Sequence, residues 1–387
     1  MFKICYIADA RQRHTIAWVD FFKSRGYEVH LISPEPPRLS DMPDIQVHLL
    51  SKFPFRIKFI SYPLDLLFYA IGIKKLIKKI RPQILHGHYI IECGFWSALS
   101  GFHPLILSAW GSDILVWPNK SRIFRFIAQY SMNRADLITT TTEEMRKYIL
   151  ERYKVRSEKV KLLSWGPNFD IFRVGYNEEG KIIRKSLNMP DSDFVILSPR
   201  NMTELYGIET IILSMPFIIK KYPKVCLVLL EGNVDSYYKE SLKKIVENLS
   251  ITKYVRFISQ YLTPYQMAAY YNISDVFVSI PSTDQLGVTI LEGMMCGSAP
   301  ILSKLKVYEQ YFTQDRNALF VVRENPQDIA KNIMYYIENP EIKNKFFMSN
   351  KNIIEERWNW QKNAPIMEKA YINLVKRGQN GLEDSVI

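Results

Sequence analysis

Two carboxylates eight positions apart, Asp284 and Glu292, are the residues of this chain whose type and spacing point most directly to chemistry. They lie within residues 274–301, where a run of β-branched and aromatic residues ends in a Pro-Ser-Thr turn and an apolar-periodic helix begins. Such a turn lies at the carboxyl end of a sheet strand, and the backbone N–H groups around Gly287 suit a phosphate. The segment predicts a nucleotide-sugar site. The alternative is a solvated turn followed by an ordinary helix charge.

The composition is that of a globular protein of two domains. The chain has 387 residues, of which 47% are hydrophobic and 23% charged, enough for two separate cores. Its four cysteines lack paired spacing, which predicts reduced thiols and neither a disulfide framework nor a zinc site. The net charge of +12 favours an anionic partner. Because no helix-turn-helix, zinc finger or other nucleic-acid module is evident, a membrane surface or a phosphorylated substrate is preferred to nucleic acid.

Short apolar strands alternate with amphipathic helices along the chain. In the first half the expected strands are 2–9, 29–33, 84–89, 105–111 and 137–142, and the expected helices are 14–25 and 64–80. Beyond the breaker at 167–168 the pattern restarts, with strands at 194–200, 225–232, 255–259 and 276–280 and helices at 207–221, 238–247 and 264–272.

This alternation predicts an α/β fold with two parallel-sheet, Rossmann-like domains, covering residues 1–167 and 168–360. The last periodic segment, 361–376, is a candidate to pack back on the first domain. A cleft between the domains is the expected site, because a pocket at a domain interface can open and close around two substrates.

Over nearly its full length the chain resembles the retaining glycosyltransferases of family 4, which have the two-domain GT-B architecture. The strongest match is the acidic pair with seven residues between its members, followed by GMMCGSAP at 293–300. The resemblance implies that Glu292 binds the donor ribose and that Asp284 holds hydroxyls of the donor sugar, with Asp where the family more often has Glu. A carboxylate suits such diols because it only accepts hydrogen bonds when ionised. Leu286, Gly287 and Val288 are assigned to the same donor site.

The segment SPRNMTELYG, residues 198–207, resembles the phosphate-clamping strand of that family, which has Gly-Arg followed by Lys-Gly. Arg200 matches the arginine, whereas Tyr206 stands where the lysine is expected. Arg200 is therefore expected to bind the donor diphosphate and to stabilise the negative charge that develops on it. The alternative for Arg200 is a surface ion pair.

His86 and His88 occupy alternate positions at the end of the strand 84–89, so their side chains point the same way. Two histidines without a nearby third ligand make a poor metal site, and no metal or other cofactor is expected. The resemblance implies that His88 contacts the donor sugar near the reacting carbon. The alternative is a core histidine with its hydrogen bonds satisfied, and His86 is expected to support rather than to react.

Two loops are candidates for the acceptor side. SAWGSDIL at 108–115 resembles a Gly-Ser/Thr-Asp loop of the family, in which Gly111 allows close backbone approach and Asp113 meets acceptor or sugar hydroxyls. Asp113 is equally suited to cap a helix. The opening loop lacks the glycine pair that the family often has there, and Arg11 and His14 are candidates to bind an anionic acceptor instead.

A membrane contact is predicted from the helix 64–80, which ends in IKKLIKKIR and follows Phe53, Phe55 and Phe59. The alternative is a solvated helix end. No secretory signal and no transmembrane segment is evident, so the protein is expected in the cytoplasm, with peripheral contact at the inner face of the membrane.

The expected activity is retaining transfer of a hexose-type sugar from a nucleoside diphosphate sugar to a hydroxyl acceptor, which can be lipid-linked, in polysaccharide or glycolipid assembly. Two alternatives remain open. One is a nucleotide-sugar epimerase on the same scaffold. The other is a catalytically silent sugar-nucleotide binder, which is suggested by the missing lysine and glycine pair.

Overall fold

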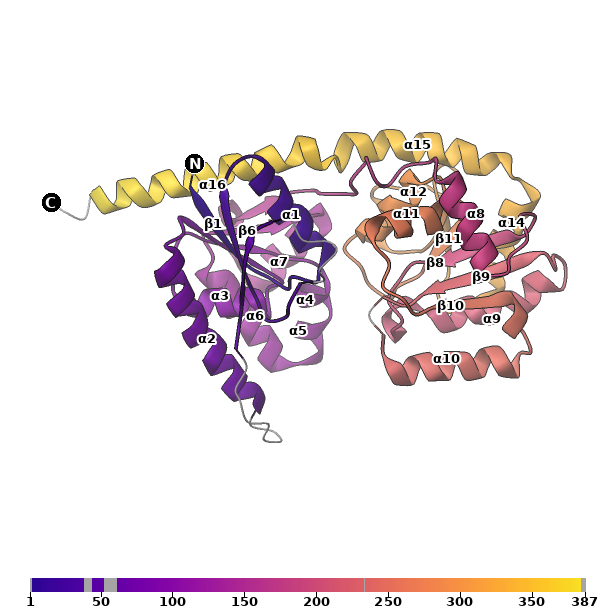
Figure 1. The fold of residues 1–387 in the computed structure, drawn as a ribbon, viewed down its shortest axis with the longest axis horizontal. Coiled ribbons are helices and arrows are strands. Elements are labelled where there is room, and N and C mark those ends of the chain that lie inside the picture. The colour runs from indigo at the N-terminus through magenta and orange to yellow at the C-terminus, as the bar shows by residue number, and fades with distance from the viewer. Residues whose placement is uncertain (1, 38–43, 52–60, 233, 384–387) are drawn as a thin grey trace. The chain divides into compact units, whose positions relative to one another are not determined.

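The computed structural model of the protein describes residues 2–37, 44–51, 61–232 and 234–383. The chain divides into two units (Figure 1). Unit 1 comprises Met1–Ser164 together with Gln361–Ile387, and unit 2 comprises Trp165–Trp360. The breaker signal in the sequence lies at 167–168, close to the first crossing between the units.

Unit 1 is built on a seven-stranded sheet with the order β3-β2-β1-β4-β5-β6-β7, and its strand pairs are parallel. Its strands are β1 Lys3–Ile7, β2 Glu28–Ser33, β3 Gln46–Leu49, β4 Ile84–His88, β5 Leu105–Ser108, β6 Leu137–Thr140 and β7 Val160–Leu162. Its helices are α1 Arg13–Ser24, α2 Ser61–Ile80, α3 Cys93–Ser100, α4 Ser112–Leu115, α5 Trp117–Lys120, α6 Arg122–Arg134, α7 Glu143–Tyr153 and, from Gln361 onward, α16 Trp360–Glu383.

Unit 2 is built on a six-stranded parallel sheet with the order β10-β9-β8-β11-β12-β13. Its strands are β8 Phe194–Ser198, β9 Val225–Leu230, β10 Val255–Ile258, β11 Val276–Ser279, β12 Ala299–Ser303 and β13 Leu319–Val321. Its helices are α8 Asn177–Ser186, α9 Ile208–Ile219, α10 Ser236–Asn248, α11 Pro264–Ile273, α12 Val288–Met295, α13 Lys306–Glu309, α14 Pro326–Glu338 and α15 Glu341–Arg357.

Each sheet reverses its strand order once, between β1 and β4 in unit 1 and between β8 and β11 in unit 2. In open α/β sheets the loops that leave the carboxyl ends of two such strands diverge and form a crevice for ligands. The prediction of two parallel-sheet, Rossmann-like domains is confirmed.

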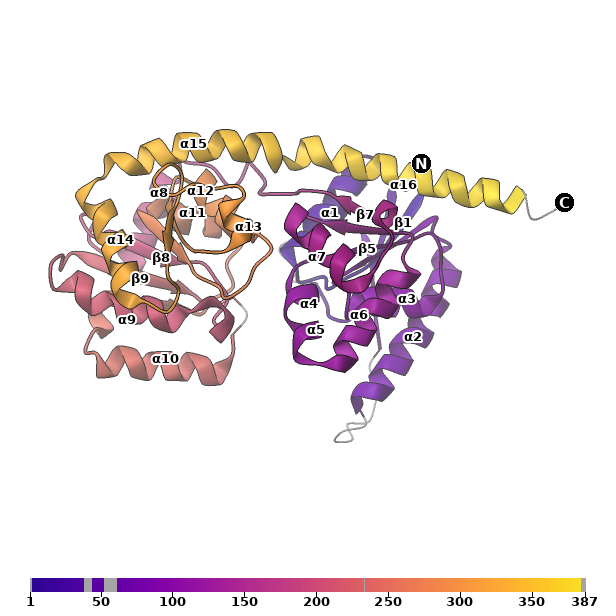
Figure 2. The same ribbon diagram turned by 180° about the vertical axis from the view of Figure 1, so that it is seen from behind.

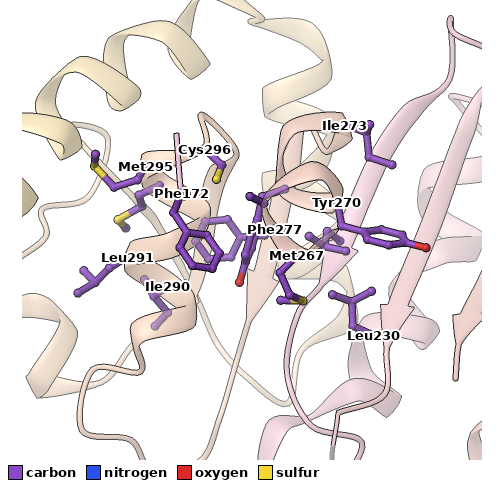
Figure 3. Close-up of a cluster of buried hydrophobic side chains, with 14 of the residues drawn as sticks. Phe172, Leu230, Met267, Tyr270, Ile273, Phe277, Ile290, Leu291, Met295 and Cys296 are labelled. Carbon is purple, nitrogen blue, oxygen red and sulfur yellow. The ribbon is translucent and has the colours of Figure 1, made fainter. Parts of the chain in front are cut away.

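The core of unit 2 sets the position of α12. Side chains of α11, α12 and the neighbouring strands interlock over one face of the sheet, as Figure 3 shows for Met267, Tyr270, Phe277, Ile290, Leu291 and Met295. A Cβ on Gly293 would lie 2.8 Å from the Phe277 ring, so only glycine lets α12 approach β11 this closely. The rigid packing of α12 holds the residues on its first turns in place.

Candidate functional site

The loops that follow β8 and β11, the strands at the strand-order reversal of unit 2, bring Arg200 and Asp284 together although these residues are 84 positions apart in the chain. Arg200 follows β8, Asp284 follows the neighbouring strand β11, and Arg200 Nη2 lies 3.0 Å from Asp284 Oδ2. The second terminal nitrogen, Nη1, donates to Thr289 Oγ1 on α12 at 2.9 Å. Arg200 is buried in this pair, so it is not the surface ion pair of the alternative interpretation.

Two tyrosines complete this cluster. The Arg200 guanidinium carbon lies 4.3 Å from the centre of the Tyr206 ring, within the range of a cation–π contact. The Tyr308 hydroxyl donates to Asp284 Oδ2 at 2.6 Å. Tyr206 thus takes the expected place of a lysine but contributes a ring face rather than a charge. Sequence reasoning missed Tyr308 and Thr289, because neither stands in a motif that indicates its partner.

The charges in this cluster depend on one another. Burial opposes the charged form of Arg200, but the Asp284 carboxylate outweighs this effect and the pKa of Arg200 is raised. Burial, reinforced by Asp284, raises the pKa of Tyr308, so its hydroxyl remains a proton donor. The guanidinium is therefore a permanent cation whose counter-charge in this structure is a carboxylate of the protein.

The turn between Asp284 and α12 is shaped to fit closely around Arg200. A Cβ on Gly287 would lie 2.3 Å from Arg200 Nη1, so any side chain at this position would displace the guanidinium. Leu286 has a φ of 56°, a left-handed conformation that bulky residues rarely adopt, and such strain occurs most often at functional sites. The backbone N–H of Gly287 points toward Asp284 Oδ2, at 3.3 Å.

Helix α12 starts at Val288, directly beside the guanidinium. Its N-cap residue, Gly287, makes no side-chain cap hydrogen bond. The N-terminus of a helix favours an anion, because its first backbone N–H groups point outward along the axis. Glu292, in the second turn of the same helix, is buried with an exposed fraction of 6%. The loops after β8 and β11 therefore place an arginine beside a helix N-terminus, a combination that suits phosphates, and the same segment carries two carboxylates, which suit hydroxyl groups.

In unit 1, β4 carries His86 and His88 toward the same side, as the alternation predicts. His86 is part of a buried chain of hydrogen bonds: its Nε2 is 2.8 Å from Ser108 Oγ, and its Nδ1 contacts the Tyr371 hydroxyl of α16. The Tyr371 hydroxyl also lies 3.1 Å from that of Tyr6. His86 is held on both nitrogens, which agrees with the expected supporting role.

His88 lies at the carboxyl end of β4 and differs from His86. Neither of its ring nitrogens has a hydrogen-bond partner among the described residues, although its exposed fraction is only 1%. Its ring packs against Trp110 at 5.0 Å between centroids, and the indole N–H of Trp110 is equally unsatisfied within the described residues. Burial, followed by the nearby His14, lowers the pKa of His88 to about 3, so its ring is neutral near pH 7.

Asp113 holds two loops together. Its carboxylate accepts hydrogen bonds from the backbone N–H groups of Ile90 at 2.8 Å, Gly111 at 2.8 Å and Trp110 at 3.1 Å. Burial raises its pKa to about 6, and these N–H groups limit the rise. Gly111 has a φ of 118°, which favours glycine. The N-cap of α4 is Gly111, so Asp113 is not the N-cap residue of the alternative interpretation but a buried residue of the first turn. Both of its oxygens already accept these backbone hydrogen bonds.

His14, in the first turn of α1, lies near His88, whereas Arg11 in the loop before this helix is engaged with Asp9. His14 stacks edge-on against Trp110 with centroids 5.2 Å apart, and burial lowers its pKa to about 3. Arg11 forms a two-pronged contact with Asp9, with Nε–Oδ1 at 3.0 Å and Nη2–Oδ2 at 2.9 Å. An anionic acceptor would have to compete with Asp9 for this arginine.

The described residues also bear on a metal ion and on a membrane span. No group of three or more His, Cys, Asp or Glu side chains there is arranged to hold a metal ion. Over the same residues, no helix combines the length and the apolar character needed to span a bilayer. Phe53, Phe55 and Phe59 of the predicted membrane contact lie outside the described residues.

Comparison with known proteins identifies the family. Residues 3–142 match the family model described as glycosyl transferase 4-like, and residues 180–353 match that of glycosyl transferases group 1. A glycosyltransferase of Methanocaldococcus jannaschii is 21% identical over 83% of this chain and 84% of its own length. The alpha-monoglucosyldiacylglycerol synthase of Acholeplasma laidlawii is 19% identical over 92% of both chains.

Among solved structures, HepE of Anabaena in complex with UDP and glucose is similar at 16% identity, with a TM-score of 0.81 and coverage of 96% of this chain and 99% of that chain. Such a likeness shows the fold, which is GT-B. The two family models show that the chain belongs to the family-4-type glycosyltransferases.

Proposed function

We propose that the protein transfers a hexose-type sugar from a nucleoside diphosphate sugar to a hydroxyl acceptor and retains the anomeric configuration. The observation that carries the proposal is the buried Arg200 guanidinium beside the N-terminus of α12, at the strand-order reversal of unit 2. A diphosphate is the ligand that suits both a fixed guanidinium and a helix N-terminus. The complex of HepE with UDP and glucose supports the same class of donor.

In this proposal the diphosphate replaces Asp284 as the partner of Arg200. The carboxylate, still held by Tyr308, then accepts hydrogen bonds from the donor sugar, while Glu292 accepts them from the ribose. Because Tyr206 supplies no charge, Arg200 and α12 provide the stabilisation of the departing phosphate. Such preorganised charge is worth several kcal/mol in a site from which water is excluded, about 2.7–4 kcal/mol per donor.

Retention follows in this proposal from attack on the face that the leaving group departs from, with a phosphate oxygen accepting the acceptor proton. His88 contributes as a neutral ring, since its pKa is lowered to about 3 by burial. It can orient a sugar hydroxyl without repelling a cationic sugar carbon as an imidazolium would. The reaction is proposed to need no metal ion.

The proposed acceptor is a lipid-linked or polysaccharide hydroxyl, used at the cytoplasmic face of a membrane. The name of the Acholeplasma laidlawii relative, a monoglucosyldiacylglycerol synthase, supports a glycolipid product. Helix α2 supports a peripheral contact, because Lys74, Lys75, Lys78 and Lys79 are all exposed along its last turns. These lysines also complement the negative end of the helix dipole.

Ligand-induced thermal stabilisation tests the donor site. UDP, GDP, CDP and ADP should be compared with the corresponding nucleosides, on the wild type, on Arg200→Ala and on Arg316→Ala, whose arginine is exposed in the same unit. At a ligand concentration of about 100 Kd the expected stabilisation is about 2.7 kcal/mol for the wild type and for Arg316→Ala. Arg200→Ala should respond to none of the ligands. If diphosphates stabilise Arg200→Ala as strongly as the wild type, the donor site lies elsewhere.

The reaction itself is tested with the sugar nucleotide of the base that binds. Release of nucleoside diphosphate should continue in EDTA, and proton NMR of the product should show the anomeric configuration of the donor. Binding without release would indicate a silent binder, and a changed ring configuration of the bound sugar nucleotide would indicate an epimerase. Either outcome would replace the proposal.

A further inference from the structure

Helices α5 and α6 of unit 1 expose large apolar side chains. Ile123 is 71% exposed, Phe126 69% and Trp117 41%. Ile123 and Phe126 are three residues apart on α6, so they are neighbours on one side of the helix. The other side of α6 buries Ala128 and Met132. The exposed pair is therefore not needed to hold α6 on the unit.

The same segment is strongly basic. Residues 117–134 contain four Lys or Arg residues and no Asp or Glu. Lys120, Arg122 and Arg125 are exposed next to the apolar residues. The α5–α6 surface is defined here as Trp117, Lys120, Arg122, Ile123, Arg125 and Phe126. Aromatic and aliphatic side chains bordered by cations are the composition that binds the interface of an anionic bilayer.

The α5–α6 surface belongs to a layer of helices that includes α2. Helix α6 packs against α3, and α3 packs against α2 (Figure 2). On α2, Phe68 and Ile71 are exposed by 39% and 47%. A bilayer is flat and wide, so it can contact more than one helix of such a layer. The α5–α6 surface differs from the lysine-rich end of α2 because its apolar and basic residues stand side by side.

We propose that the α5–α6 surface docks unit 1 on an anionic bilayer, with Ile123 and Phe126 inserted among the lipid headgroups and acyl chains. The cations supply charge complementarity to acidic phospholipids. Helix α5 packs against α4, which carries Asp113 and follows the carboxyl end of β5. Docking therefore brings this edge of the sheet near the lipid headgroups. The docking itself does not depend on the proposed transfer reaction.

A second copy of the chain fits this surface less well. A two-fold dimer would place the α5–α6 surface against itself and bring Arg122 and Arg125 of both copies together. No acidic residue in 117–134 could neutralise them. An anionic lipid surface neutralises the same cations without this repulsion.

Vesicle co-sedimentation of the full-length protein tests the docking. The test variant is Ile123→Glu/Phe126→Glu. The matched control is Ile182→Glu, since Ile182 is 68% exposed on α8 of unit 2 and also has basic neighbours. The wild type and Ile182→Glu should bind phosphatidylcholine vesicles that contain phosphatidylglycerol, and binding to pure phosphatidylcholine should be weak. The double variant should bind at least about tenfold more weakly.

A milder variant guards against misfolding. Arg122→Glu alters one exposed charge and should weaken binding at low salt more than at high salt. Donor-dependent stabilisation should be unchanged in all variants, which separates this result from failure of the proposed function. Undiminished vesicle binding by Ile123→Glu/Phe126→Glu, or equal weakening by Ile182→Glu, would overturn the proposal. A wild-type dimer that the double variant abolishes would assign the surface to a second copy instead.

Discussion

Replacing Asp284 by Asn should destabilise unit 2, because it leaves the buried Arg200 guanidinium without its counter-charge. The two side chains are 13% and 7% exposed and 3.0 Å apart. Removing one partner of a buried ion pair costs about 3–5 kcal/mol. Asn keeps an oxygen that can accept from Tyr308 or Arg200, so we expect the lower end of that range, about 3 kcal/mol. In a unit of about 200 residues this corresponds to a fall in Tm of about 6 to 12 °C.

A double-mutant cycle measures the coupling. Denaturant unfolding should be followed for the wild type, Asp284→Asn, Arg200→Met and the double variant, in which no unpaired cation remains. The unfolding free energy lost in the double variant should be smaller than the sum of the unfolding free energies lost in the two single variants by about 1–3 kcal/mol. The control is Glu178→Gln, which removes the exposed ion pair with Lys181 and should leave the midpoint unchanged.

Inorganic pyrophosphate extends the same experiment to the ligand. Because its phosphate oxygens can replace the missing carboxylate, it should raise the Tm of Asp284→Asn by more than that of the wild type. Two results together would refute the reasoning that Asp284 pairs with the arginine that binds phosphate. They are additive losses of unfolding free energy of less than about 0.5 kcal/mol per variant, and equal rises in Tm on addition of pyrophosphate.

Two further predictions concern the glycine of the turn and the buried histidine of unit 1. Gly287→Ala should weaken pyrophosphate binding at least about tenfold, because the added Cβ would displace Arg200 Nη1. The control is Gly72→Ala on α2, where the added Cβ would meet only Leu50, at 3.7 Å. This control should preserve binding and stabilise the helix by up to about 1 kcal/mol. Titration of pyrophosphate into both variants checks this, and equal affinities would contradict it. Burial lowers the pKa of His88 to about 3 in the folded chain, so below about pH 6.5 the unfolded chain binds a proton that the folded chain does not. The contribution of His88 to the free energy of unfolding is therefore fully present above about pH 6.5 and is lost as the pH falls toward 3. Between pH 7.5 and 5 the wild type should lose about 2 kcal/mol more unfolding free energy than His88→Phe, as measured by denaturant titration, and parallel losses would count against a neutral buried His88.

The spacing and periodicity of the sequence were sufficient to predict two parallel-sheet domains and the strand-turn-helix segment around Asp284 in unit 2. Strands such as 225–230 are continuous apolar runs, which buried parallel strands require, so their positions follow from local composition. The inner strand β12, which begins at the end of the GMMCGSAP segment, was not anticipated. The edge strands β3, β7 and β13 were not anticipated either. Each has only three or four residues, too few to establish a period, and an edge strand is covered less completely than a central one.

The strand-turn-helix unit around Asp284 and Glu292 was likewise predictable, since the turn residues and the helix that follows are adjacent in the chain. The partners of Asp284 were not. Arg200 lies 84 residues before it and Tyr308 lies 24 residues after it. The link between His86 and Tyr371 spans 285 residues. Nothing in a local pattern specifies which side chains such distant segments will place in contact.

The sequence by itself therefore determined the α/β class, most of the strands and the strand-turn-helix unit around Asp284, because hydrophobic periodicity records which face of an element is buried. Only the tertiary structure decided what the site residues do before a ligand arrives. It pairs Arg200 with Asp284, binds the Asp113 carboxylate to three backbone N–H groups, and leaves His88 without a hydrogen-bond partner among the described residues. These roles depend on strand order and burial, which arise from packing between segments that the chain keeps far apart.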